Sequence, residues 1–290
     1  MYRIGKGIIA SILGLCLAGT ALAQTPNAPS GPPKVLVIAR EVIKLGQRSA
    51  HEKFEAGWPK AFTAANWPVH YLAVSSMSGE SRALYITGYD SEEAWEKDNQ
   101  AQRKNAALGQ QLDALSLKDA DFLKESRTGV FSYMPDISYN ANVEIGSMRY
   151  FRIVDIQVKP GHNDHFVEVR KLVRAAHEKA GLKDHFAIYH LNGGGSPGMY
   201  LIMLPMKSLA EDDQFDNMHG ADYKTALGQD GQKSLADFNM QGVESIDSEI
   251  FEFSPKMSYP SKAWIDSDPA YWTAKDDSAP QTTAKSPAKK

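Results

Sequence analysis

Cysteine is almost missing from this sequence, and its one copy lies where we expect it to be removed. Among 290 residues the only cysteine is Cys16, inside an apolar run over residues 8–17 that is too short to span a bilayer. Basic residues precede this run, and Ala21-Leu22-Ala23 follows it as a cleavage site of the A-x-A kind. We therefore predict a signal peptide over residues 1–23, and a periplasmic or secreted mature chain without disulfides, thiol nucleophiles or thiolate metal ligands.

Neither an excess of charge nor a known catalytic signature is present. The formal net charge is −3, which gives no basic footprint for nucleic acid. The sequence has no Ser-His-Asp order, no G-x-S-x-G elbow, no H-E-x-x-H pair and no glycine fingerprint for nucleotides. The glycine-rich stretch 192–198 is not followed by Lys-Ser/Thr, and a strand is predicted after it. The sequence therefore names no reaction, and we expect no cofactor, no nucleic-acid partner and no membrane contact once the signal peptide is cleaved.

Both ends of the predicted mature chain lack the large apolar residues that a core requires. Residues 24–33 are rich in Pro, Ala, Ser and Gly, and we interpret them as a disordered linker. Residues 261–290 form a C-terminal extension, and from about residue 274 it consists mostly of Lys, Ala, Ser, Thr and Pro. That last part is predicted to be disordered, because it cannot bury enough surface to become ordered.

What the sequence does contain is a long internal repeat. VFSYMPDISY at residues 130–139 and IFEFSPKMSY at residues 250–259 share the frame aliphatic-Phe-x-aromatic-x-Pro-x-x-Ser-Tyr. A shift of 115 residues also aligns earlier parts of the chain without a gap, and it matches Lys44 with Lys159, His70 with His185, Gly79 with Gly194, and Tyr85 with Tyr200. Such self-similarity indicates two copies of one structural unit. We therefore predict a first repeat over residues 34–139, a linker over 140–147 and a second repeat over 148–260.

Each repeat has the same order of predicted strands and helices. In the first repeat the patterning predicts strand 35–43, helix 47–65, strands 69–76 and 82–89, helices within 91–125, and strand 128–134. In the second it predicts strand 149–158, helix 163–180, strands 184–191 and 199–205, helices within 208–242, and strand 247–254. Pro59 predicts a kink in the first helix. The order βαββαβ is ferredoxin-like, with helices on one face of a four-stranded antiparallel sheet.

The uncovered faces of the two sheets need a cover, and each copy can supply it for the other. We therefore predict an α+β fold in which two tandem ferredoxin-like repeats form an intramolecular dimeric α/β barrel, so that a monomer suffices. By topology, internal repeat and aromatic strands, residues 34–260 resemble the dimeric α/β-barrel superfamily in a tandem form, with no specific member indicated. The superfamily includes antibiotic-biosynthesis-type monooxygenases, dye-decolourising and chlorite-cleaving haem enzymes, and stress-response barrels. The resemblance implies a site between a sheet and a helix, or inside the barrel.

Three functions remain open from the sequence. The missing catalytic signature favours an exported binding or structural module for a small apolar molecule. The resemblance also allows a cofactor-free monooxygenase acting on aromatic or quinol substrates, and a haem-binding barrel. For haem, the axial ligand would come from His185, His190 or His219.

Histidines are the first candidates for chemistry. His70 and His185, at matched positions at the start of the second strand of each repeat, are candidate bases or hydrogen-bond donors. The alternative, which we favour, is that they are polar strand-edge residues kept for packing. His162 and His165 stand three apart at a helix start, a spacing that can place two imidazoles on one side of a metal ion. Because H-x-x-H is common by chance, we favour a surface cluster there and expect no metal.

Aromatic and charged residues at matched positions are candidates for ligand binding. The aromatic candidates are Tyr85, Tyr200, Tyr133 and Phe253. Alternate positions of a strand share one face, which is either core or the lining of an apolar cavity. Arg40 and Asp155 occupy matched positions on the first strands, and they would pair across the two repeats if both faced the interior, because a buried charge needs compensation. Exposed edge positions are the alternative.

Overall fold

The computed structural model describes residues 31–215 and 220–273. The predicted signal peptide, most of the predicted linker, His219 and the tail from residue 274 lie outside the described residues. Within the described ranges, no helix is long and apolar enough to cross a membrane.

The first half of the barrel follows the predicted order of elements. It consists of β1 (Val35–Ile43), α1 (Arg48–Glu55), α2 (Gly57–Ala64), β2 (Tyr71–Ser76), β3 (Arg82–Tyr89), α3 (Glu92–Lys104), α4 (Ala106–Asp119) and β4 (Leu123–Tyr133). The helix predicted over residues 47–65 is divided at Ala56, and Pro59 falls in the first turn of α2, where a missing N–H removes no helical hydrogen bond. The predicted kink is thus confirmed as a break between two short helices.

The second half repeats this order. It consists of β5 (Tyr150–Val158), α5 (Asn163–Ala180), β6 (Ala187–Gly193), β7 (Met199–Met206), α6 (Asp212–Phe215), α7 (Ala221–Gln241) and β8 (Val243–Phe253). The minor elements are the 3₁₀ turns η1 (Pro135–Ile137), η2 (Ile145–Ser147) and η3 (Leu209–Glu211), and helices α8 (Lys262–Ser267) and α9 (Pro269–Trp272) after β8. The matched glycines Gly79 and Gly194 both have positive φ, 71° and 88°, in the hairpin of each half. Glycine adopts this conformation without strain, which explains why both copies carry it.

Two strands are longer than the sequence pattern predicts. β4 starts at Leu123 and β8 at Val243, whereas the predicted strands start at residues 128 and 247. Residues 124–128 of β4 and 244–248 of β8 are exposed to solvent, so the side chains there do not alternate between apolar and polar. Alternation is the sequence signal of a half-buried strand, and these extensions therefore carry no signal.

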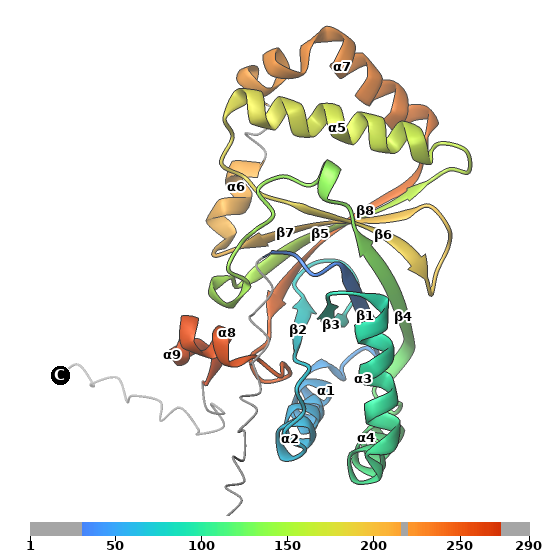
Figure 1. The fold of residues 1–290 in the computed structure, drawn as a ribbon, viewed down its shortest axis with the longest axis vertical. Helices are drawn as coiled ribbons and strands as arrows, with labels where there is room; N and C mark the ends of the chain where they lie inside the picture. The colour runs from blue at the N-terminus through green and yellow to red at the C-terminus, as the bar shows by residue number, and fades with distance from the viewer. Residues whose placement is uncertain (1–30, 216–219, 274–290) are drawn as a thin grey trace, which may run out of the picture.

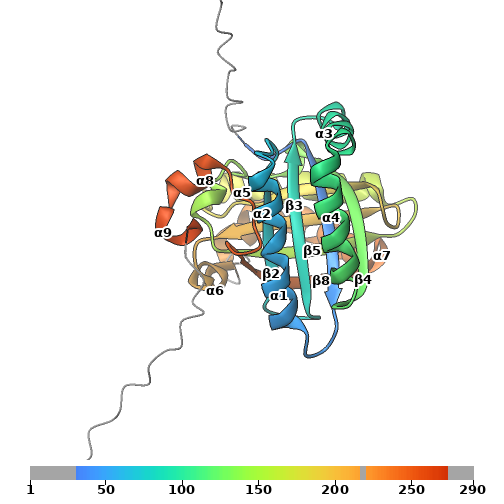
Figure 2. The same cartoon turned by 90° about the horizontal axis from the view of Figure 1, so that it is seen from below.

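All eight strands close into one antiparallel barrel, in the order β1-β3-β2-β8-β5-β7-β6-β4. Each half supplies one four-stranded sheet, and the halves join where β2 pairs with β8 and where β4 pairs with β6. Helices α5 and α7 lie on one outer side of the barrel, and α1 to α4 lie on the other (Figure 1). In Figure 2, α1, α2 and α4 run along the strands of the first sheet. The predicted α+β fold, two tandem ferredoxin-like repeats closed as an intramolecular α/β barrel, is confirmed.

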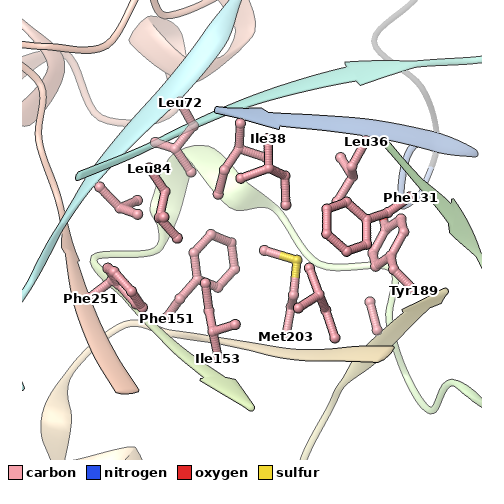
Figure 3. Packing of buried hydrophobic residues seen from close by; sticks show 14 of the residues in the cluster. Leu36, Ile38, Leu72, Leu84, Phe131, Phe151, Ile153, Tyr189, Met203 and Phe251 are labelled. Atoms are coloured by element: carbon pink, nitrogen blue, oxygen red, sulfur yellow. The ribbon is translucent and has the colours of Figure 1, made fainter. Parts of the chain in front are cut away.

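Apolar side chains from both sheets meet inside the barrel (Figure 3). Phe131 and Phe151 are 2% and 4% exposed there. Two candidates for ligand binding belong to the same core. The ring of Tyr133 lies 5.4 Å from that of Tyr189, and the ring of Phe253 lies 4.8 Å from that of Phe151. The interior of the described barrel is therefore packed with side chains, as a core is.

Two ion pairs beside this core join the halves. The guanidinium of Arg40 in β1 donates two hydrogen bonds to the carboxylate of Asp155 in β5, at 2.9 and 2.8 Å. Arg82 in β3 donates to Glu249 in β8 at 2.8 Å. The pairing that the matched positions of Arg40 and Asp155 suggested is therefore present, and the two side chains compensate each other's charge.

The repeated Ser-Tyr motif connects each half to the other. Ser138, which follows β4, accepts a hydrogen bond from the backbone N–H of Ile188 in β6 at 2.9 Å. Ser258, which follows β8, accepts the matched bond from Ala73 in β2, also at 2.9 Å. The tyrosine hydroxyls that follow donate to backbone carbonyls of the same opposite halves, Tyr139 to Leu182 at 2.9 Å and Tyr259 to Trp67 at 2.7 Å. The motif is therefore a reciprocal clasp between the two repeats.

Candidate functional site

Four ionisable side chains meet beneath the helices of the first half. They are Glu41 on β1, His51 and Glu55 on α1, and Asp119 at the end of α4, and one nitrogen or oxygen atom of each lies within 4.8 Å of the others. We call these four residues the carboxylate cluster. His51, Glu55 and Asp119 are 1%, 2% and 4% exposed, and the Glu41 side chain is 12% exposed. Three carboxylates and an imidazole thus share a site that is nearly closed to water.

Ordinary features of each element bring these residues together. In β1, side chains alternate between the barrel core and the helices, so Glu41 faces the helices while Ile38 faces the core. His51 and Glu55 are four residues apart in α1 and lie on one face of the helix. Asp119 is the last residue of α4, which packs against α1 and α2. The site is therefore built on rigid elements rather than on loops.

The hydrogen bonds of the cluster are incomplete. His51 Nε2 lies 3.0 Å from Glu41 Oε2 and 3.5 Å from Asp119 Oδ1. Glu55 Oε1 accepts a bond from the Trp58 indole N–H at 2.9 Å. Asp119 Oδ1 is buried and has no hydrogen-bond partner among the described residues. The Asp119 carboxyl lies against those of Glu55 and Glu41, and a proton shared among these groups can supply its missing bond.

The electrostatics of the cluster favour bound protons or a bound cation. Burial raises the pKa of Glu55 from 4.5 to about 8, with a hydrogen bond from Tyr85 opposing the rise and the charges of Glu41 and Asp119 adding to it. Burial, followed by the charge of Glu41, raises the pKa of Asp119 from 3.8 to about 6. Without a cation, the three carboxylates therefore do not all ionise at neutral pH, because like charges in a dry site repel. A positive ion between them would remove this obstacle.

Two tyrosines border the cluster. Tyr85 on β3 and Tyr71 on β2 have ring centroids 6.1 Å apart. Both hydroxyls are buried, and that of Tyr85 lies against the carboxyl group of Glu55. Burial raises the pKa of both tyrosines, and the carboxylates of Glu55 and Glu41 raise it further, so the phenols stay protonated at neutral pH. Of the aromatic candidates named from the sequence, only Tyr85 borders the cluster.

The second half fills the same space with aromatic packing. The shift of 115 residues matches Glu41 with Ile156 and His51 with Phe166, and the shift of 119 that aligns the later helices matches Asp119 with Phe238. Ile156, Phe166 and Phe238 are each at most 1% exposed, in one apolar core under α5 and α7. The ring centroids of Phe166 and Phe238 are 5.7 Å apart. The fourth residue, Glu55, stands opposite Arg170. The fold therefore does not require polar residues at three of the four positions, and the first half carries them at a cost in stability.

The matched histidines lie outside the carboxylate cluster. His70 is half-buried just before β2, with its ring 4.5 Å from that of Tyr259, and burial lowers its pKa. His185 is half-buried before β6, and its Nε2 lies 2.6 Å from the backbone carbonyl oxygen of Pro205. His70 thus contacts the second half through Tyr259, whereas His185 contacts its own half, and neither belongs to a group of potential metal ligands among the described residues.

The H-x-x-H pair at the start of α5 does not build a metal site in the part of the chain that the structure describes. The rings of His162 and His165 are 6.4 Å apart, and His165 packs against Phe238 with 5.2 Å between ring centroids. Within that part, the carboxylate cluster is the only group in which three or more potential ligands converge.

A shallow pocket of about 390 Å³ lies beside α5 in the second half, lined by His190, Asn163, Asn192, Leu191 and the glycine-rich loop after β6. The candidate Tyr200 borders it, since its hydroxyl donates to Asn163 Oδ1 at 3.2 Å and its ring lies 4.8 Å from that of His190. Burial lowers the pKa of His190, so its imidazole is neutral at neutral pH. The pocket can therefore offer a neutral imidazole to a small molecule.

The carboxylate cluster is not among the sites that the sequence predicts. Its members have no motif spacing, and only His51 and Glu55 show the four-residue separation of one helix face. The useful signal was in the repeat alignment, where three polar residues of the first copy stand opposite Ile156, Phe166 and Phe238. A polar residue at a position that is apolar in the other copy indicates a role other than packing.

No family profile and no curated protein sequence matches the chain. Solved structures do match. A suspected monooxygenase from Fusobacterium nucleatum subsp. nucleatum superposes with a TM-score of 0.52 at 10% identity, covering 77% of this chain and 93% of that protein. An anthrone oxidase-like protein superposes with a TM-score of 0.52 at 12% identity, covering 79% of this chain and 94% of that protein. By its fold, the chain is thus a dimeric α/β barrel in the tandem two-repeat form.

Proposed function

We propose that this protein binds one metal ion in the first half of its barrel, through Glu41, His51, Glu55 and Asp119. The observation that carries the proposal is the convergence of four ligand atoms within 4.8 Å of one another in a site nearly closed to water. Carboxylate oxygens with one imidazole nitrogen suit hard and borderline cations such as Mn²⁺, Fe²⁺ and Zn²⁺.

The geometry is close to that of a ligand shell. Four ligand atoms arranged tetrahedrally at about 2.1 Å from a metal ion lie about 3.4 Å apart. Ligand atoms that are now up to 4.8 Å apart would therefore approach one another by up to about 1.4 Å when an ion binds. Asp119 Oδ1, which lacks a partner in the described structure, would gain one.

A cation also removes the electrostatic cost of the cluster. Three ionised carboxylates carry a charge of −3, and burying them without a counter-charge is strongly unfavourable. A divalent ion reduces this to −1 and allows Glu55 and Asp119 to ionise at neutral pH. The second half shows that Ile156, Phe166 and Phe238 pack well at the same place, so packing alone gives no reason for Glu41, His51 and Asp119. Glu55 stands opposite another charged residue, Arg170.

Two of the similar structures have names that refer to oxidation. One is named as a suspected monooxygenase and the other as anthrone oxidase-like. We therefore include in the proposal that the metal serves an oxidation in a periplasmic or secreted protein, with the predicted signal peptide directing export. A haem group is not part of the proposal, because in the described residues the cluster occupies the space under the helices of one half and Phe166 and Phe238 that of the other.

The test is metal binding by the purified, chelator-treated protein. Calorimetric titration with Mn²⁺ or Zn²⁺ should give one ion per chain, and Glu55→Gln or Asp119→Asn should weaken binding by about 10- to 100-fold. The matched control is Asp98→Asn, which alters an equally buried carboxylate of the same half. Asp98 accepts bonds from Trp67 at 2.9 Å, Tyr89 at 2.8 Å and Gln102 at 3.0 Å. No binding, or equal loss in the control, would refute the proposal.

A second candidate function rests on the pocket of the second half. Its volume of about 390 Å³ suits a small molecule, and His190 with Asn192 supplies polar groups beside the apolar Leu191. In this second proposal, the small-molecule binding expected from the sequence takes place outside the barrel interior. Binding of a fluorescent naphthalene probe, weakened by His190→Ala and unaffected by Glu55→Gln, would support it. Equal binding to both variants would contradict it.

A further inference from the structure

One arginine of the second half carries a charge that no described residue neutralises. Arg170 lies on α5, and its Nε is buried without a hydrogen-bond partner. Within the described ranges, its two terminal nitrogens also form no hydrogen bond and no ion pair, but they are not among the fully buried atoms. The terminal nitrogens are therefore still within reach of solvent, while the rest of the guanidinium is removed from water.

The other partly buried arginines of the described structure each pair with a carboxylate. The pairs are Arg40 with Asp155, Arg82 with Glu249, Arg149 with Asp268, Arg152 with Asp212, and Arg174 with Glu178. Arg48 and Arg103, for which the described residues offer no ion pair either, are exposed to solvent. A charge that is removed from water needs compensation, so Arg170 differs from every arginine in a comparable position.

Aromatic rings do not replace the missing counter-charge. The guanidinium carbon of Arg170 lies 5.4 Å from the centroid of the Phe166 ring, one turn earlier in α5. In a dry site, such a ring attracts a cation more weakly than a carboxylate does. Burial lowers the pKa of Arg170 from 12.5 to about 10, and Tyr223 of α7 opposes the fall. The guanidinium therefore remains charged at neutral pH.

The acid on this side of α5 is already engaged by another residue. Arg170 and Asp184 both act on the pKa of Tyr223, after the larger effect of burial, so the phenol lies near both groups. Asp184 Oδ2, however, lies 3.1 Å from His177 Nε2. No carboxylate acts on the pKa of Arg170 itself. The described chain thus places its acid beside His177 and leaves Arg170 without one.

The repeat gives this position a counterpart of opposite sign. The shift of 115 residues matches Arg170 with Glu55, so both halves carry an ionisable side chain at this place in the first long helical segment. In the first half, Glu55 lies among other potential ligands of a cation. In the second half, the cation stands alone, and the group that would compensate it is an anion.

We propose that Arg170 anchors an anion-binding site in the second half, and that the site takes a small oxyanion, either a phosphate group or the carboxylate of a ligand. A guanidinium presents parallel N–H groups that match two oxygens of either group. Binding forms hydrogen bonds only and involves no covalent step. Arg170 belongs neither to the carboxylate cluster nor to the lining of the pocket beside His190, so this site is independent of both functions proposed above.

The experiment compares sodium phosphate and sodium acetate with sodium chloride at equal ionic strength, using chelator-treated protein at neutral pH. Calorimetric titration and thermal unfolding should show that an oxyanion binds and stabilises the native protein, whereas chloride does not. Arg170→Met should weaken oxyanion binding by about 10- to 100-fold. Without any added oxyanion, the same variant should melt at a higher temperature than native protein, because it removes an uncompensated charge.

The matched control is Arg174→Met, which removes the same charge one turn further along α5. Arg174 is paired with Glu178 at 3.0 Å, so this variant should bind the oxyanion as native protein does. The tighter of phosphate and acetate identifies the group that the site prefers.

Three results would overturn the inference: a response of native protein no larger than that to chloride, equal affinity in Arg170→Met, or equal loss in Arg174→Met. If Arg170→Met does not fold, nuclear magnetic resonance of native protein decides, because the Nε–H signal of Arg170 must move when the oxyanion is added. An unmoved signal refutes the site. Since a chelator is present throughout, failure here leaves the proposed metal binding untouched, and failure of metal binding leaves this site untouched.

Discussion

Replacing Glu55 by glutamine should stabilise the metal-free protein at alkaline pH and leave it nearly unchanged at acid pH. In the folded protein, burial and the neighbouring carboxylates raise the pKa of Glu55 to about 8, against 4.5 for the free side chain. Between these two pH values the unfolded chain has lost the proton and the folded chain still holds it. Stability therefore falls as pH rises through this window, because the unfolded state binds fewer protons.

The size of the effect follows from the two pKa values. Each pH unit in the window contributes about 1.4 kcal/mol, so a rise from 4.5 to about 8 corresponds to roughly 4–5 kcal/mol at pH 8. Glu41 and Asp119 lie in the same site and share the bound protons, which divides this cost among three groups. We expect Glu55→Gln to recover about 2–3 kcal/mol of unfolding free energy at pH 8. The glutamine oxygen can still accept the bond from Trp58.

The assay is urea denaturation at pH 5 and pH 8 with a chelator present, followed by tryptophan fluorescence. The control is Glu96→Gln, which makes the same chemical change at an exposed position of α3. A saturating metal ion should reverse the sign at pH 8, because the native carboxylate then binds the ion and glutamine binds it less well. If native protein and Glu55→Gln lose stability equally between pH 5 and pH 8, the buried-carboxylate argument is wrong.

Two further predictions concern the contacts between the halves. Ser138→Ala and Ser258→Ala should each lower the unfolding free energy by about 1–3 kcal/mol, because each leaves a buried backbone N–H of the opposite half without an acceptor. Urea titration measures this, and Ser126→Ala at an exposed position of β4 serves as the control. Asp155→Ala should destabilise more than the double variant with Arg40→Met, because the single change leaves a part-buried guanidinium unpaired; a double-mutant cycle that shows strict additivity would contradict this.

Much of the fold could be predicted from the sequence, because its signals are local. The apolar runs and turns that define β1 and α5 involve residues a few positions apart, and their predicted ranges agree with the structure to within a residue. The duplicated motif then supplied the long-range information, since two equal units with open sheet faces can cover each other. Local signals failed at Leu123 and Val243, where both strands begin among exposed residues that do not alternate.

The candidate site could not be predicted in this way. Glu41, His51, Glu55 and Asp119 come from three elements, and each one alone is an ordinary polar residue of a strand or a helix end. They form a site because they are removed from water together, and this removal depends on how α1 and α4 pack on β1. The matched histidines His70 and His185 were easier to see in the alignment, yet the structure places them outside the cluster.

The sequence by itself determined that the chain contains two copies of one βαββαβ unit, because periodicity and duplication are properties of neighbouring residues and of the order of elements. Only the tertiary structure decided which of the two equal places became polar, since Phe166 and Phe238 fill one half while His51 and Asp119 occupy the other. It also decided that the Ser-Tyr motif of each copy bonds to the opposite copy. Both results depend on contacts between distant segments, whose burial sets the cost of a charge and the partner of a hydrogen bond.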